Sequence, residues 1–334
     1  MQSFEYFRPA TVQDAVHAFT TAPPGARYIA GGTTLYDLMK LNIEQPRRLI
    51  DVTSIKGLDT IEQNSKRLRF GALASMSAVA ADAVVSRDYP VLTEALTKAA
   101  SQQLRNMATV GGNLLQRTRC MYFRNGADGA YPCNKRQPGA GCAAIGGLDR
   151  GQAILGASSS CNAVSPGDWP VALTALDAEI EITGATGMRT VPIAELYRLP
   201  GETPHREFNL QAGELITAIE IPRTAAGRHS TYHKIRDRES YAFALASAAV
   251  ALEIRDDQVT SARIALGGVA TRPWRASEAE AMLVGQRLTL AQATAAGHAA
   301  FRNARPGRDN GFKLELGART IADALLIAGG RNRT

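Results

Sequence analysis

The stretch Tyr28-Ile29-Ala30-Gly31-Gly32-Thr33-Thr34-Leu35 joins a short apolar run to a pair of glycines and a pair of threonines. The apolar run predicts a strand, and residues 35–41 predict a helix behind it. A diphosphate needs several backbone N–H donors that converge without side chains in the way, and paired glycines at a strand end supply them. A second stretch, Thr109-Val110-Gly111-Gly112-Asn113, has the same form, so the two together predict a clamp on one pyrophosphate. Two tight turns would give the same glycine pairs, and neither stretch is a GxGxxG or P-loop motif.

Helical and strand patterns surround both stretches, so the fold class that we predict is α+β. The Pro- and Gly-containing run 222–228 is the best linker candidate. We expect three units, at 1–57, 58–222 and 223–334. The expected strands are 4–8, 28–30, 49–52, 68–73, 179–182, 231–235, 243–254 and 259–266, and the expected helices are 12–19, 35–41, 75–81, 91–100, 169–176, 277–283, 290–303 and 312–328.

All four cysteines of the chain fall within residues 120–161, inside a segment that lacks helical or strand periodicity. A long irregular loop in a compact domain usually has a functional reason. Four thiolates on such a loop form the ligand set of a tetrahedral zinc or of an iron–sulfur cluster, and the spacing does not decide between the two. Two disulfides would be the alternative in an exported protein. The candidate metal ligands are Cys120, Cys133, Cys142 and Cys161.

The bulk composition excludes several classes of protein. The formal net charge of +7 comes from basic residues that are spread along the chain, which is typical of a solvated surface and not of a nucleic-acid partner. No apolar stretch reaches the length of a membrane-spanning helix, and the first ten residues lack the features of an export signal. No nucleophile, base and acid form a recognisable set, so the sequence favours electron transfer over hydrolytic chemistry.

Taken with their neighbours, the two glycine stretches resemble the flavin-pyrophosphate loops of the molybdenum hydroxylase flavoproteins. This family includes the medium subunit of carbon monoxide dehydrogenase and the central part of xanthine dehydrogenase. The resemblance covers nearly the whole chain and implies a two-part FAD-binding domain of the PCMH (vanillyl-alcohol oxidase-like) type, followed by a smaller C-terminal α+β domain. It continues through Ser165-Pro166-Gly167-Asp168, Leu199-Pro200-Gly201, Gly213-Glu214-Leu215-Ile216, residues 232–238, Ala265-Leu266-Gly267-Gly268-Val269-Ala270 and Pro273-Trp274-Arg275.

The resemblance also implies which residues hold FAD. The first loop would wrap the pyrophosphate and ribityl chain, and Asp168 would contact the sugar–phosphate region. A cation such as Lys234 near the flavin would stabilise negative charge, although a solvated lysine on a strand is the alternative. The implied FAD-binding residues are Arg27, Tyr28, Ile29, Ala30, Gly31, Gly32, Thr33, Thr34, Leu35, Thr109, Gly112, Asn113, Asp168, Ile216 and Lys234.

Residues 115–161 depart from most members of the family, which run almost directly from TVGGN to the SPxxD segment. Insertions of this kind mark members that hold an extra 4Fe-4S cluster, and the runs around Cys120, Cys133 and Cys142 resemble the FAD-binding subunits of bacterial periplasmic aldehyde oxidoreductases. The resemblance therefore implies that the four cysteines bind a 4Fe-4S cluster. Five nearby cations would offset the negative charge of the thiolates, namely Arg117, Arg119, Arg124, Lys135 and Arg136.

The function implied by the resemblance is that of an electron-transfer subunit in a heterotrimer. Aldehyde oxidation would occur at a molybdenum cofactor in a large partner, and electrons would pass through a small 2Fe-2S partner to FAD and then to an external acceptor. A stand-alone flavin reductase and a zinc-stapled binding module are the alternatives. The expected location is the periplasm, reached by co-export with a signal-bearing partner, with the cytoplasm as the alternative.

Overall fold

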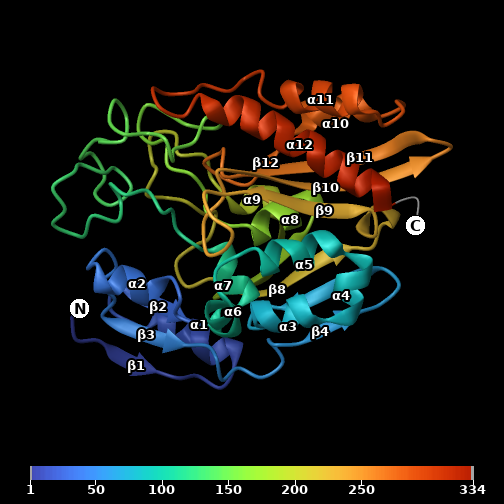
Figure 1. Ribbon diagram of the computed structural model, residues 1–334. Helices are drawn as coiled ribbons and strands as arrows, with labels where there is room; N and C mark the ends of the chain where they lie inside the picture. The colour runs from blue at the N-terminus through green and yellow to red at the C-terminus, as the bar shows by residue number, and fades with distance from the viewer. Residues whose placement is uncertain (1, 332–334) are drawn as a thin grey trace.

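The computed structural model describes residues 2–331, and its first unit is a small parallel sheet in the order β1-β3-β2. A helix precedes β2 and another precedes β3, as parallel strands require. Ala15, Ile50 and Val52 form the buried core between the sheet and its helices. In Figure 1 this unit is the blue part of the ribbon. Its elements are β1 (Glu5–Phe7), α1 (Val12–Thr20), β2 (Ala26–Ile29), α2 (Leu35–Lys40) and β3 (Arg48–Asp51).

The second unit is a five-stranded antiparallel sheet, in the order β4-β5-β8-β6-β7, with helices packed on one face. Phe70 on the central part of this sheet and Trp169 on a covering helix are fully buried, with ring centroids 5.6 Å apart. The strands are β4 (Ile61–Gln63), β5 (Arg67–Gly71), β6 (Glu179–Gly184), β7 (Gly187–Pro192) and β8 (Leu215–Pro222). The helices are α3 (Met76–Ala81), α4 (Ala83–Asp88), α5 (Pro90–Thr97), α6 (Gln102–Met107), α7 (Val110–Leu114), α8 (Trp169–Ala175) and α9 (Ile193–Leu196).

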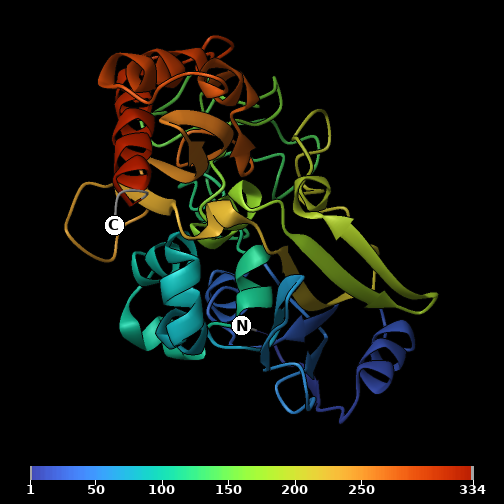
Figure 2. The same ribbon diagram turned by 90° about the vertical axis from the view of Figure 1, so that its right-hand side faces the viewer.

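The third unit is a four-stranded antiparallel sheet, in the order β12-β11-β10-β9, covered by three helices. Its core is a separate apolar cluster, rich in alanine, between β10, β11 and the long last helix. In Figures 1 and 2 the orange strands and red helices lie over the helices of the second unit. The elements are β9 (Ser230–Ile235), β10 (Ala246–Arg255), β11 (Gln258–Gly267), β12 (Trp274–Arg275), α10 (Ser277–Leu283), α11 (Leu290–Ala299) and α12 (Phe312–Gly330).

The segment between α7 and α8 contains no helix or ladder strand, as the sequence predicted. Its far end is nevertheless held firmly by the third unit. The N–H of Ile154 donates to Val269 O at 2.9 Å, and Arg305 N–H donates to Ile154 O at 2.7 Å. The Nζ of buried Lys313, on α12, donates to Gln152 O at 3.0 Å. This segment is the green loop of Figure 1.

The α+β class is confirmed, and several local predictions were wrong for identifiable reasons. The run 222–228 is not a free linker, because it contains the short 3-10 helix Ala225–Gly227, in which Ala226 and Gly227 are buried. The strand expected at 243–254 begins only at Ala246, since the preceding residues form an irregular connection from β9. The boundaries that we predict at 57/58 and 222/223 stay a prediction.

Candidate functional site: a cavity between the first two units

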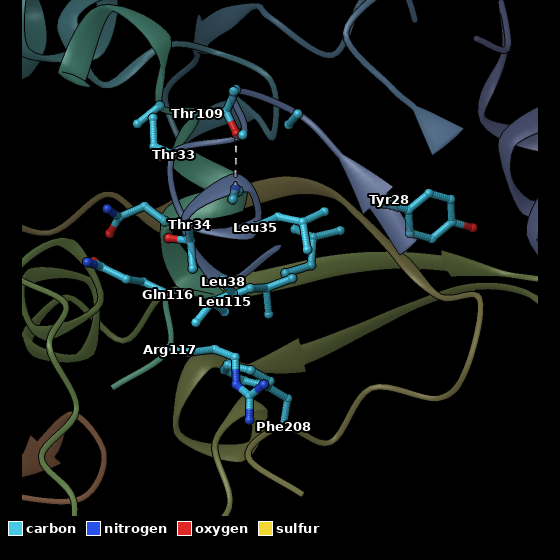
Figure 3. A pocket seen from close by; sticks show the side chains of 18 of the residues that line it. Tyr28, Thr33, Thr34, Leu35, Leu38, Thr109, Leu115, Gln116, Arg117 and Phe208 are labelled. Atoms are coloured by element: carbon cyan, nitrogen blue, oxygen red, sulfur yellow. Dashed lines mark hydrogen bonds between the residues drawn. The ribbon is translucent and has the colours of Figure 1, made fainter. Parts of the chain in front are cut away.

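One large cavity, of about 1180 Å³, lies where the first unit, the second unit and the β9–β10 connection meet. All fifteen residues that the sequence singled out for FAD line it. They come from β2, the connection to α2 and its first residue, α7 and its N-cap, the N-cap of α8, β8 and β9. Figure 3 shows Thr33 and Thr109 toward one end of the cavity, and Arg117 and Phe208 toward the other. The fold thus brings together positions that lie up to two hundred residues apart in the chain.

The first glycine pair has two different structural requirements. A Cβ added at Gly31 would lie 1.8 Å from Met107 O, so the main chain of the first loop packs directly against the residues before the second loop. Gly32 has φ +71°, in the left-handed region that favours glycine. The two glycine stretches therefore lie side by side, and each depends on the absence of a side chain.

The second glycine pair differs from the turn that the sequence predicted. Gly111 and Gly112 lie in the first turn of α7, which follows helix α6 and not a strand. Thr109 is the N-cap residue of α7, and its Oγ1 accepts a hydrogen bond from Gly112 N–H at 3.1 Å (Figure 3). The sequence expectation failed because Thr109 caps a helix that is too short for its periodicity to be visible. Gly111 is also required by packing, since an added Cβ would lie 2.6 Å from Ala72 Cβ.

The polar groups of the cavity fit a nucleotide cofactor. Asn113 lines the cavity, and its Oδ1 is buried and has no hydrogen-bond partner, although its Nδ2 contacts Met76 Sδ at 3.5 Å. A buried acceptor left unpaired is costly, so an N–H or O–H donor of a ligand would complete it. At Gly31 the neighbouring atoms are main chain only, and the N–H groups of Gly32 to Thr34 have no other acceptor within residues 2–331, which suits a diphosphate. The residues present therefore fit FAD.

An ion pair closes the cavity on the side of the third unit. Lys234 Nζ lies 2.8 Å from Asp168 Oδ2, and the two side chains are 1 % and 5 % exposed. The solvated lysine that the sequence left open is therefore excluded, because Lys234 is buried and paired. A pair this deeply buried requires hydrogen bonds to its remaining atoms. Tyr232 supplies one of them, since its hydroxyl donates to Asp168 Oδ1 at 2.5 Å.

A second charged group lies between the cavity and the cysteine segment. Arg117 lines the cavity and pairs with Glu44 at 2.6 Å and with Glu207. Lys135 also pairs with Glu207, at 2.8 Å. Burial alone would raise the pKa of Glu207, but Arg117 and Lys135 hold that pKa below its ordinary value. Glu207 therefore stays ionised and ties the two regions together.

The predicted role of the basic residues around the cysteines was only partly right. Arg119 and Arg124 both pair with Asp37, and Arg136 donates to main-chain carbonyls, because each guanidinium finds a nearby oxygen. Lys135 alone among the five favours the thiolate of Cys161 electrostatically. The sequence did not identify Asp37, Glu44 and Glu207 as partners of these cations, because the paired residues lie far apart in the chain.

The four cysteines lie in one neighbourhood as a series of adjacent pairs. Cys120 packs against a small cluster that contains Cys133, and Cys133 pairs with Cys142 through a main-chain bridge. The Cys142 and Cys161 thiols lie next to each other, and their interaction lowers the pKa of Cys142 and raises that of Cys161. Within residues 2–331, no three His, Cys, Asp or Glu side chains are arranged to hold a metal ion. In the same range no helix is long and apolar enough to cross a membrane.

Some lining residues were not assigned from the sequence. Phe208, Arg206 and Leu38 line the cavity, and Tyr232 lies directly behind it. Tyr232 lies inside a run that carries the family resemblance, Leu38 follows the first glycine stretch by three residues, and Phe208 lies in an irregular connection between two such runs. Arg206 and Phe208 reach the cavity only because the connection between α9 and β8 folds back over it, and the sequence does not show that fold.

The fold and the cavity define a class of flavoprotein, and comparison with known proteins gives the same result. Residues 2–224 match the family model described as the FAD binding domain in molybdopterin dehydrogenase, and residues 230–326 match the CO dehydrogenase flavoprotein C-terminal domain. The chain therefore belongs to the FAD-binding subunits of the molybdopterin dehydrogenases, and it is an oxidoreductase subunit.

Individual relatives cover almost the whole chain. The sequence is 48 % identical, over 98 % of this chain and 99 % of the relative, to the aldehyde oxidoreductase FAD-binding subunit PaoB of Escherichia coli. It is 29 % identical to the carbon monoxide dehydrogenase medium chain of Afipia carboxidovorans, over 86 % of this chain and 81 % of the relative. A solved carbon monoxide dehydrogenase from Hydrogenophaga pseudoflava superposes with a TM-score of 0.78 at 27 % identity, covering 99 % and 98 % of the two chains.

Proposed function

We propose that this chain is the FAD-binding electron-transfer subunit of a molybdenum-dependent aldehyde oxidoreductase. The observation that carries the proposal is the single cavity lined by all fifteen predicted FAD residues. The 48 % identity to an aldehyde oxidoreductase subunit supports the aldehyde as the class of substrate. The chain matches only the flavoprotein domains of the family, so oxidation of the aldehyde would take place on a partner chain.

The chain's own residues would bind and orient the cofactor. Main-chain N–H groups of Gly32, Thr33 and Thr34 would donate to the diphosphate, because within residues 2–331 none of them has another acceptor. The N–H groups of Gly111 and Gly112 already donate to Ala72 O and Thr109 Oγ1, so the second loop would contribute its close packing. Asn113 Oδ1 would accept from the ligand, and Lys234 would place a positive charge at the cavity wall. When bound, FAD supplies one- and two-electron redox chemistry. Main chain and buried ion pairs hold these groups in place, so little reorganisation accompanies a change of charge.

We further propose that the chain works in a heterotrimer with a large molybdenum-cofactor subunit and a small 2Fe-2S subunit. Electrons would reach FAD from the small subunit and leave to an external acceptor. Support comes from the relatives, among them the medium chains of carbon monoxide dehydrogenases, whose name describes one chain of several.

The four cysteines are proposed to bind a 4Fe-4S cluster. Their adjacency in pairs supports this, since ligands brought near one another by the fold need only local rearrangement around a metal. Leu38 lines the flavin cavity and belongs to the same small apolar cluster as Cys133, so the two regions are neighbours. A cluster held there would lie beside the flavin.

The periplasm is the location that we propose, reached by co-export with a partner that carries the signal. The resemblance of the cysteine segment to periplasmic aldehyde oxidoreductase subunits supports it. Fractionation of the native host tests it, because the chain should be found with periplasmic markers. Its presence only with cytoplasmic markers would contradict the proposal.

Purification from the native host tests the proposed function as a whole. We expect an affinity-tagged chain to bring down two further chains, molybdenum, iron and FAD. We also expect a panel of aldehydes to contain at least one that bleaches the flavin absorbance of the complex anaerobically and leaves the isolated chain unchanged. A colourless chain with stoichiometric zinc, or aldehyde oxidation by the chain alone, would contradict the proposal.

A further inference from the structure

Every polar group of Tyr232, on β9, forms a hydrogen bond. Its main-chain N–H donates to Glu94 Oε2 at 2.7 Å, and its carbonyl accepts from Lys98 Nζ at 2.5 Å. Both partners lie on or next to α5, which covers the open edge of the sheet that β9 forms. The Tyr232 ring is fully buried. Its position is therefore fixed independently of any ligand.

The Tyr232 hydroxyl occupies the centre of a buried hydrogen-bond chain. It donates to Asp168 Oδ1 at 2.5 Å, and it accepts from Ser247 Oγ at 2.9 Å. Burial and the nearby Asp168 carboxylate raise the pKa of Tyr232 well above its ordinary value, so the hydroxyl keeps its proton. It is thus a permanent donor to one oxygen of the Asp168 carboxylate.

The other oxygen of Asp168 accepts from Lys234, which faces the cavity. Lys234 Nζ donates to Asp168 Oδ2 at 2.8 Å and to Lys98 O at 3.0 Å. An ammonium group has three N–H donors, so one remains for a ligand in the cavity that Lys234 lines. Asp168 and Lys98 O together fix the direction of that third donor.

We infer that Tyr232 is the positioning residue that fixes the direction of the Lys234 ammonium toward bound FAD, acting through Asp168. This inference rests on the proposed function, since it assumes that FAD occupies the cavity. No other side chain is recorded as a donor to Asp168 Oδ1 within residues 2–331. Tyr232 itself does not line the cavity, so its effect on the cofactor is indirect.

Loss of the Tyr232 hydroxyl has a defined electrostatic consequence. The carboxylate of Asp168 would keep one donor in place of two, and its charge would concentrate on the bond to Lys234. A tighter pair would draw the ammonium away from the cavity and reduce the positive field there. Weaker binding of FAD and a more negative flavin potential would follow, because the reduced cofactor carries the extra negative charge.

The test compares Tyr232→Phe with Tyr197→Phe in the complete complex. Tyr197 is a suitable control because it is buried, its hydroxyl donates to Leu114 O at 2.8 Å, and it does not line the flavin cavity. We expect Tyr232→Phe to raise the FAD dissociation constant roughly tenfold. We also expect its flavin midpoint potential, from spectroelectrochemical titration, to be more negative, while Tyr197→Phe keeps the wild-type potential.

The outcomes separate this inference from the proposed function. If the wild-type complex contains no FAD, the proposed function fails and the inference fails with it. If FAD is present and Tyr232→Phe has the wild-type potential, Tyr232 is merely structural and the inference alone is overturned. Should Tyr232→Phe not fold, Ser247→Ala removes the donor to the Tyr232 hydroxyl and should produce a smaller shift in the same direction. A wild-type potential in Ser247→Ala would then overturn the inference.

Discussion

Replacement of Gly31 by alanine should separate the two glycine loops and weaken FAD binding. The new Cβ would lie 1.8 Å from Met107 O and 2.6 Å from Met107 C, both main-chain atoms that cannot rotate away. An ordinary van der Waals contact begins at 3.4 Å, so the loops must separate by about 1.6 Å along this direction. Overpacking of this kind costs on the order of 1–3 kcal/mol.

That cost converts into an expected loss of affinity. If binding of FAD requires the native spacing of the loops, a penalty of about 2 kcal/mol raises the dissociation constant about 30-fold. The assay is equilibrium titration of FAD into the cofactor-free chain, followed by flavin fluorescence. Gly311→Ala is the matched control, because its backbone is helical and an added Cβ would meet no atom within 4 Å. Wild-type affinity in Gly31→Ala would refute the reasoning that loop contact shapes the site.

Further predictions concern the ion pair, the cysteines and acid stability. Lys234→Met should destabilise folding by about 3–5 kcal/mol, since it leaves a buried carboxylate unpaired; urea unfolding measures this, and exposed Lys56→Met should have no effect. Cys133→Ser should remove the iron–sulfur absorbance, and full iron content by metal analysis would contradict the ligand set. A hydrogen bond from Arg87 helps hold the pKa of buried Asp88 at about 2, below its ordinary 3.8. The stability from Asp88 is therefore complete above pH 3.8 and lost as pH falls toward 2, so Asp88→Asn should remove about 1 kcal/mol of acid dependence in thermal unfolding; an unchanged acid profile would contradict it.

The sequence predicted the residues that line the cavity better than it predicted their local structure. Gly31 and Gly112 stood out because two such glycine pairs occur in one chain, among neighbours that carry the family resemblance. Only the fold shows that one packs against the Met107 carbonyl and that the other begins a helix capped by Thr109. The clamp of both glycine stretches on one pyrophosphate stays a prediction, and the second stretch is not the strand-end turn that we expected.

The ion pairs around the cavity could not be predicted from the sequence. Arg117 pairs with Glu44 and Glu207, which lie 73 and 90 residues away, so no local pattern connects them. The same is true of Tyr232 and Asp168, which are 64 residues apart. Such contacts depend on how three separate sheets pack together, and that packing is decided by the whole chain.

The most direct test of the central claim is an experimental structure of the chain with FAD, together with the stoichiometry of binding. The account predicts one FAD per chain, with its diphosphate against the main chain of Gly32 and Gly112 and its polar groups within hydrogen-bond distance of Asn113 Oδ1. Density for FAD outside this cavity, or a chain that binds no FAD, would contradict it.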